Sequence, residues 1–147
     1  MIQTSESTSI ALDPATVPWI PIAPGESFKP LRFMPDGRAL LLRVEPGTVV
    51  ARHRHEGEVH VVNLSGSRRL DTGEIAGPGD YVYEPAGNVD SWEAVGDTPV
   101  ILHIVSFGAM EYLGNDGRVT VRHSPSSLRE TYLRYCQDHG IAPVDLG

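Results

Sequence analysis

Short apolar runs separated by proline and glycine recur along the chain, and this rhythm constrains the fold more than any other feature. Glycine and proline occupy 27 of the 147 positions (15 and 12 residues), and both favour turns. Runs of about four to eight apolar or alternating residues between such turns are typical of β-strands. The expected strands are 17–22, 39–44, 48–51, 59–64, 81–84, 91–95, 100–107 and 119–122. Short strands repeated over one domain's length predict an all-β sandwich or barrel.

The two ends of the chain differ from this central region. Residues 1–15 are rich in serine and threonine and contain few apolar side chains, so we expect a flexible N-terminal arm. Residues 16–123 hold the expected strands and form the predicted β-barrel. Ser124 and Pro125 provide a capping group and an early proline, and apolar side chains then recur at helical spacing. We therefore expect a helix and tail at 124–147, with the helix covering one sheet.

Charge and cysteine content exclude several classes of protein. Acidic residues outnumber basic ones 19 to 12, for a formal net charge of −7, so neither nucleic acid nor an anionic membrane is an expected partner. The single cysteine, Cys136, excludes an internal disulfide and a cysteine-rich zinc site. No run approaches the roughly 18 apolar residues that cross a bilayer, and residues 1–12 do not have the pattern of a targeting signal. These features predict a cytoplasmic protein.

His53 and His55 are the strongest candidates for chemistry. Side chains at i and i+2 of a strand point to the same face about 6.6 Å apart, so two imidazoles at this spacing can bind one metal ion. His60 can rejoin them if a turn at Glu56-Gly57 intervenes. The alternative is that these histidines are packing residues of the core or a chance surface pair. Their charged neighbours and the apolar run that starts at Val61 favour a polar site at the mouth of an apolar cavity.

Two patterns surround these histidines. They are Gly47-x5-His53-x-His55-x4-His60-x5-Gly66 and Gly79-x5-Pro85-x-Gly87-x2-Asp90. They resemble the two motifs of the cupin family, G-x5-H-x-H-x3,4-E-x6-G and G-x5-P-x-G-x2-H. The resemblance implies a single-domain cupin, a double-stranded β-helix that forms a jelly-roll-like barrel, here with a C-terminal helix. The chain departs from the pattern twice, because His60 stands in place of the usual glutamate and Asp90 in place of the last histidine.

Within the cupins, the chain resembles the small dioxygenases that cleave acetylacetone and 2,4'-dihydroxyacetophenone. The likeness lies in residues 79–87, in Val59-His60 and in residues 107–110. It implies a mononuclear Fe(II) site, with Zn, Ni or Mn as alternatives. His53 and His55 match two ligand histidines of these relatives, and the third maps onto Asp90. Ligation by Asp90 would give the two-histidine, one-carboxylate set of non-haem iron oxygenases. Without it, His60 is the candidate third ligand.

Two further residues are candidates for catalysis. In the resembling diketone-cleaving enzyme, a glutamate at this spacing lies beside the metal shell. This implies that Glu84 holds a ligand histidine or an arginine such as Arg69 or Arg43. Glu84 could instead be an exposed strand residue. His103 could face the cavity and serve as an acid or a base, although a histidine in a run as apolar as 100–105 is more often structural.

The resemblance implies an Fe(II) dioxygenase that binds a small β-diketone or hydroxyketone, reacts it with O2 and breaks a carbon–carbon bond. One alternative is a non-oxidative enzyme in which Zn or Ni is a Lewis acid for an isomerisation, cyclisation or hydrolysis, because a fold does not fix a function. Another is a metal-binding sensor module like the cupins attached to anti-sigma factors, although 147 residues leave no room for that class's separate helical domain. We also expect a homodimer, formed through an edge strand and the arm.

Overall fold

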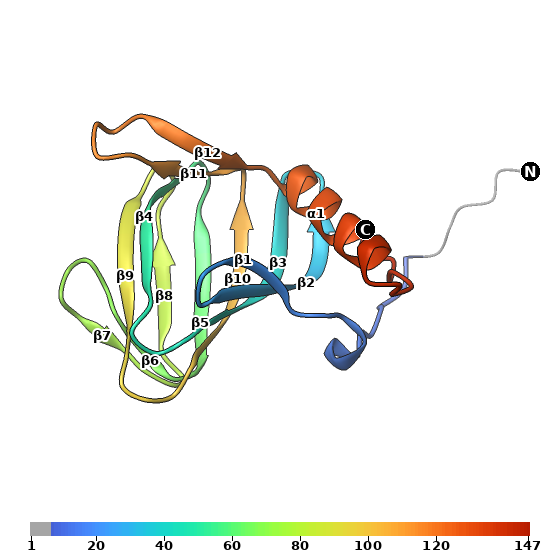
Figure 1. Cartoon of the computed structure of the whole chain (residues 1–147), viewed down its shortest axis with the longest axis horizontal. Helices are drawn as coiled ribbons and strands as arrows, with labels where there is room; N and C mark the ends of the chain where they lie inside the picture. The colour runs from blue at the N-terminus through green and yellow to red at the C-terminus, as the bar shows by residue number, and fades with distance from the viewer. Residues whose placement is uncertain (1–6) are drawn as a thin grey trace, which may run out of the picture.

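The computed structural model describes residues 7–147 and contains two antiparallel sheets that face each other (Figure 1). In spatial order, the first sheet consists of β1 (Ile20–Ala23), β2 (Glu26–Met34), β3 (Gly37–Val44), β10 (Val100–Phe107), β5 (Val59–Ser65) and β8 (Tyr81–Glu84). The second consists of β12 (Val119–His123), β11 (Met110–Leu113), β4 (Val49–His55), β9 (Val89–Val95), β6 (Ser67–Arg69) and β7 (Ile75–Ala76). With the helix α1 (Pro125–Asp138), these sheets confirm the predicted all-β jelly-roll architecture.

The sequence predicted the central strands and missed three strands that line the cavity described below: β2, β6 and β11. β3, β5, β8 and β10 were all predicted from their apolar or alternating residues. β2 was missed because Glu26, Lys29 and Pro30 interrupt its apolar pattern. The register of its pairing with β3 shifts just after Pro30, so the strand is irregular at the residue that lacks an N–H donor. β11 was missed because only four residues follow the turn at Gly108.

Apolar side chains form two buried clusters. One lies between the sheets and comprises Val44, Val50, Val59, Val61, Trp92, Ala94, Val100 and Leu102. The other joins the N-terminal segment, the β2–β3 hairpin, α1 and the C-terminal tail, and comprises Val17, Ile20, Phe28, Phe33, Leu40, Leu128, Tyr132, Cys136 and Leu146. Leu42 and Ile104 pack against both clusters. The second cluster extends the core beyond the two sheets.

The helix α1 begins where the sequence predicts. The Ser124 hydroxyl accepts a hydrogen bond from the backbone N–H of Ser127 at 3.1 Å, and the Ser127 hydroxyl accepts one from the backbone of Ser124 at 2.9 Å. This reciprocal capping box satisfies donors that the first turn leaves unpaired. Leu128, Tyr132 and Cys136 form its buried side. The helix therefore covers an edge of the first sheet, packed on β2 (Figure 1).

The predicted flexible arm lies partly outside the described residues, which begin at residue 7. Residues 7–13 have no regular secondary structure, and the short helix η1 (Pro14–Thr16) is capped by the side chain of Asp13. Leu12 packs against the second core cluster, so this part of the segment is attached to the domain. No helix among residues 7–147 is long and apolar enough to cross a membrane.

Gly66, the last glycine of the first motif, lies where the chain passes from the first sheet to the second. Its φ is +67°, and a β-carbon there would lie 2.4 Å from the carbonyl oxygen of Pro99. Glycine alone meets both requirements without strain. The turn leads directly into β6, which supplies a buried residue to the cavity.

Candidate metal centre and substrate cavity

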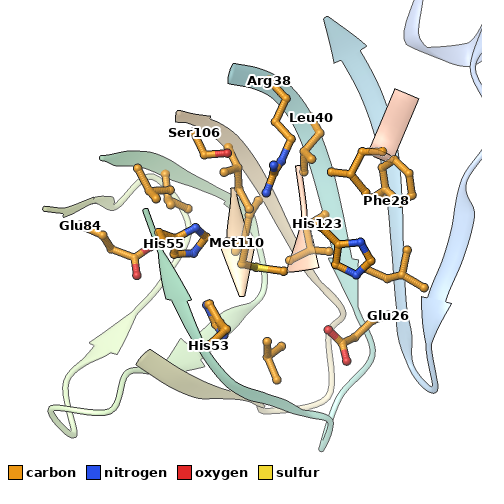
Figure 2. Close-up of a pocket in the computed structure, with 18 of the residues that line it drawn as sticks. Glu26, Phe28, Arg38, Leu40, His53, His55, Glu84, Ser106, Met110 and His123 are labelled. Atoms are coloured by element: carbon orange, nitrogen blue, oxygen red, sulfur yellow. The ribbon is translucent and has the colours of Figure 1, made fainter. Parts of the chain in front are cut away.

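A cavity of about 90 Å³ lies between the two sheets (Figure 2). This volume accommodates several water molecules or one small organic molecule. Its polar lining consists of Glu26, Arg38, His53, His55, Arg68, Glu84, Ser106, Tyr112 and His123. The remaining lining is largely apolar and includes Leu40, Val61 and Ile104. An apolar cavity with a few converging polar groups is typical of a small-molecule site.

His53 and His55 point into the cavity from β4, as Figure 2 shows. Side chains alternate along the strand, so Arg54 between them projects to the other face, where its guanidinium lies 3.0 Å from the carboxylate of Glu111. The two imidazole rings are perpendicular, with centroids 5.0 Å apart, and both side chains are buried. The pair therefore shares one face, as the i, i+2 spacing predicts.

Hydrogen bonding and burial set the chemical state of this pair. The Nδ1 atom of His53 lies 2.7 Å from the carbonyl oxygen of Ala51. Because a carbonyl only accepts, Nδ1 carries the proton and Nε2 keeps its lone pair. Burial is the main cause that lowers the pKa of His53, and it lowers the pKa of His55 to about 3, helped by the charges of His53 and Arg38. Both imidazoles are therefore neutral at neutral pH, which is the form that binds metal ions.

Two buried carboxyl groups lie beside the histidines. Asp90 on β9 is the direct cross-strand partner of His53, and Glu84 at the end of β8 lines the cavity. They are 8% and 7% exposed. Burial, and after it the charge of Asp90, raises the pKa of Glu84, while Arg68 and a hydrogen bond from Asn88 act in the opposite direction. Carboxylate oxygens next to two imidazoles form a donor set that suits a divalent transition metal.

Arg68 on β6 brings a positive charge near these carboxyl groups, although its Nε and Nη2 atoms have no hydrogen-bond partner among the described residues. The side chain is 1% exposed, and its guanidinium carbon lies 4.9 Å from the centroid of the Trp92 ring. Burial lowers the pKa of Arg68, and the charges of Glu84 and Asp90 oppose that effect. This end of the cavity therefore holds a buried cation together with two acidic groups.

The structure corrects the prediction of which arginine lies near Glu84. We predicted Arg69 or Arg43, but both form ion pairs with other glutamates, Arg69 at 3.5 Å and Arg43 at 2.8 Å. Strand alternation turns Arg68 inward in their place. Glu84 also accepts a hydrogen bond from the side-chain amide of Asn88 at 3.0 Å.

A comparison with known protein families identifies the family of this chain. The profile of the ChrR cupin-like domain matches residues 7–111, which is more than half of the chain. The chain belongs to this family. Among curated proteins, the comparison found no match.

Solved structures support the cupin assignment. An RmlC-like cupin from Ralstonia eutropha is 28% identical, with 95% of this chain and 94% of that chain covered and a TM-score of 0.89. The acetylacetone dioxygenase from Acinetobacter johnsonii is 14% identical, with coverages of 91% and 96% and a TM-score of 0.76. The anti-sigma protein ChrR from Rhodobacter sphaeroides, in complex with SigE, is 23% identical, with coverages of 61% and 48% and a TM-score of 0.57. The last two similarities establish the fold alone.

In this cupin, the structure does not bring His60 and His103 to the cavity. On β5, Val59 and Val61 face inward, so His60 between them projects from the outer face of the first sheet, where Nδ1 contacts the Tyr81 hydroxyl. His103 alternates in the same way with two inward residues of β10. The chain between β4 and β5 does turn at Glu56-Gly57, but it starts β5 with Val59 inward.

The residues present fit a metal ion in part. Among residues 7–147, no three histidine, cysteine, aspartate or glutamate side chains are already arranged to hold one. His53 and His55 have the orientation and protonation state of ligand histidines in metalloproteins, and His53 also has the outer hydrogen bond that such ligands make. Asp90 faces His53 across the strands, and Glu84 faces the cavity. These two carboxyl groups are the candidates for a third ligand.

Sequence reasoning missed the second arginine of the cavity, Arg38. The predicted strand began at residue 39, two positions after the start of β3 at Gly37, although Arg38 continues the inward alternation of Leu40 and Leu42. A charged residue in register with inward apolar ones was the available signal. Tyr112 and His123 were missed because β11 was not predicted and β12 has no buried apolar face.

Proposed function

We propose that this cupin binds Fe(II) through His53, His55 and a carboxylate oxygen of Asp90 or Glu84, and that it is a dioxygenase for a small β-diketone or hydroxyketone. The observation that carries the proposal is the cavity-facing pair of neutral histidines, with the His53 tautomer held by the Ala51 carbonyl. When bound, the metal would supply two-oxygen coordination of the substrate and reaction with O2.

The chain's own residues define the rest of the site. Leu40, Ile104 and Val61 line the cavity and exclude water from the reacting atoms. Asn88 donates to Glu84 and so restricts the rotation of that carboxyl group. In the proposed reaction the substrate takes up one O2, one carbon–carbon bond breaks, and each product fragment gains one oxygen atom. The structural similarity to an acetylacetone dioxygenase supports this choice of substrate class.

The first test is metal analysis of protein purified without oxygen, followed by O2 uptake with acetylacetone as the probe. We expect about one iron per chain and one O2 consumed per acetylacetone. His53→Ala should lose the metal, because even outer-shell changes weaken binding by about 10–100-fold. His60→Ala is the matched control, since its ring lies outside the cavity, and should retain the metal.

Three results would contradict this proposal. Bound iron without O2 uptake on any diketone or hydroxyketone would exclude the dioxygenase, and stoichiometric zinc or nickel would favour Lewis-acid chemistry. Equal metal content in wild type and His53→Ala would exclude the site itself.

A second candidate is a metal-binding sensor module. The family match supports this candidate, because the family is named after the cupin-like domain of ChrR, which is an anti-sigma protein. This function predicts tight zinc binding through the same histidines without turnover. Metal content together with the O2 measurement separates the two candidates.

A further inference from the structure

The cavity contains a second arginine, and no carboxylate in the described chain forms an ion pair with it. Arg38 on β3 lines the cavity and is only 4% exposed. Its Nε and Nη1 atoms are buried without a hydrogen-bond partner among the described residues. In Figure 2 its side chain points from the strand toward the middle of the cavity. Arg68 also has two unpaired nitrogens, Nε and Nη2, but the charges of Glu84 and Asp90 act on it. Arg38 combines unpaired donors with the absence of such a carboxylate in the described chain, and this costly combination indicates a missing partner.

A second unpaired donor lies next to it. Ser106 on β10 is the direct cross-strand partner of Arg38 and is 1% exposed, and its hydroxyl also lacks a hydrogen-bond partner in the part of the chain that the structure describes. The two side chains thus present a guanidinium and a hydroxyl at neighbouring positions of one sheet, both toward the cavity. This pair matches the oxygens of a carboxylate, which accepts two parallel hydrogen bonds from a guanidinium.

Within the described chain, no ion pair joins Arg38 to a carboxylate. Burial lowers its pKa to about 10, with Tyr112 as the only opposing influence, so the guanidinium stays charged at neutral pH. Glu26 lines the same cavity, but it makes no ion pair with Arg38. An anion entering the cavity would supply the missing charge.

The register of the first sheet relates this site to the proposed metal centre. Arg38, Ser106, Val59 and Glu84 are successive cross-strand partners on β3, β10, β5 and β8. Three strand spacings separate the ends of this row, about 14 Å between the backbones of Arg38 and Glu84. Both end side chains line the same cavity, so one ligand in it lies between them.

We propose that Arg38 and Ser106 bind the carboxylate of a small keto acid, whose carbonyl end lies toward His53 and His55. The assignment of the carbonyl end rests on the proposed function, whereas the carboxylate site stands on Arg38 and Ser106 alone. The substrate class is thereby narrowed from neutral diketones to acids that carry a carbonyl group.

Acetoacetate and acetylacetone form the matched pair of probes. They have similar size and share one acetyl group, but in acetoacetate a carboxylate replaces the second acetyl group of acetylacetone. Binding is measured by calorimetry without oxygen, so that no turnover interferes. We expect wild type to prefer acetoacetate, and Arg38→Met to weaken acetoacetate binding by about tenfold or more while acetylacetone changes little. Arg43→Met, an arginine on the outer face of the same strand, should behave as wild type.

Two further variants keep the test decisive. Arg38→Lys keeps the charge but loses the planar fork, so it should recover part of the preference. Ser106→Ala removes one neutral donor and should weaken acetoacetate binding a few-fold; it serves as the test if Arg38→Met does not fold. An equal loss for both probes, no effect of either substitution, or no binding of acetoacetate to wild type would overturn the proposal.

His53→Ala separates failure of this proposal from failure of the proposed function. If that variant loses metal but keeps an Arg38-dependent preference for acetoacetate, the carboxylate site is supported independently of the metal. If wild type binds iron and consumes O2 with acetylacetone but shows no preference for acetoacetate, the dioxygenase stands and the carboxylate site is excluded.

Discussion

The two ends of the cavity hold the same buried side chain in opposite electrostatic surroundings. Both arginines are buried, and each has two guanidinium nitrogens without a hydrogen-bond partner in the described chain. Arg68 lies against Trp92 and within the charge influence of Glu84 and Asp90, whereas Arg38 has no ion pair with a carboxylate in the described chain. The Arg68 end therefore contains its own charges of opposite sign without a ligand, and we call it the complete end. The Arg38 end does not pair its cation in this way. We therefore expect Arg68 to be required for the stability of the fold and Arg38 to be required for ligand binding.

The largest expected effect tests this comparison directly. Arg68→Met leaves two buried acidic groups without their cation and should lower the free energy of unfolding by about 3–5 kcal/mol. Arg38→Met removes an uncompensated charge and should leave stability unchanged or raise it. Urea unfolding of both variants at neutral pH, without ligands, measures the difference. Equal destabilisation by the two substitutions would contradict the distinction between the ends.

The carboxyl groups of the complete end can be ranked by their effect on metal binding. If Asp90 is the third ligand, Asp90→Asn should weaken binding of the native metal by more than Glu84→Gln does. The smaller of the two effects should be about 10-fold, as for an outer-shell partner. Competition with a chelator of known affinity measures both. The reverse order would identify Glu84 as the ligand, and two negligible effects would exclude a carboxylate ligand.

Burial of His55 predicts acid sensitivity at the complete end. Its pKa falls from an unfolded value near 6.5 to about 3, so between these values the unfolded chain binds more protons and stability drops as pH falls. At pH 5 the metal-free protein should have lost about 2 kcal/mol through this group. Unfolding of wild type and His55→Asn between pH 7 and 4 isolates the contribution. Parallel curves for the two proteins would contradict it.

The smallest effect concerns the helix beside the Arg38 end, where Leu128 contributes to the cavity lining. Ser124→Ala removes the capping hydroxyl of α1 and should cost about 1 kcal/mol of stability. Metal content should not change, because the complete end does not contact this helix. Thermal unfolding and metal analysis of the same preparation check both statements. A loss of metal would show that the two ends are coupled through α1.

The sequence was informative wherever local pattern and local chemistry agree. Alternation predicted β8 and β10 to the residue, the Ser-Pro pair predicted the start of α1, and the i, i+2 spacing placed His53 and His55 on one face. It failed where position depends on a distant partner. Asp90 could be interpreted as a turn residue from its neighbours, yet pairing with β4 places it inside β9, opposite His53.

By itself, then, the sequence determined the class of fold, the cupin motifs and the paired histidines, because each depends on residues within a few positions of one another. Only the tertiary structure decided which face each remaining side chain occupies. It placed His60 and His103 on the outer face, Arg68 rather than Arg69 on the inner face, and Arg38 beside Ser106 without an acidic partner among residues 7–147. The physical reason is that strand register acts across the whole sheet, and a shift of one residue exchanges the inner face for the outer.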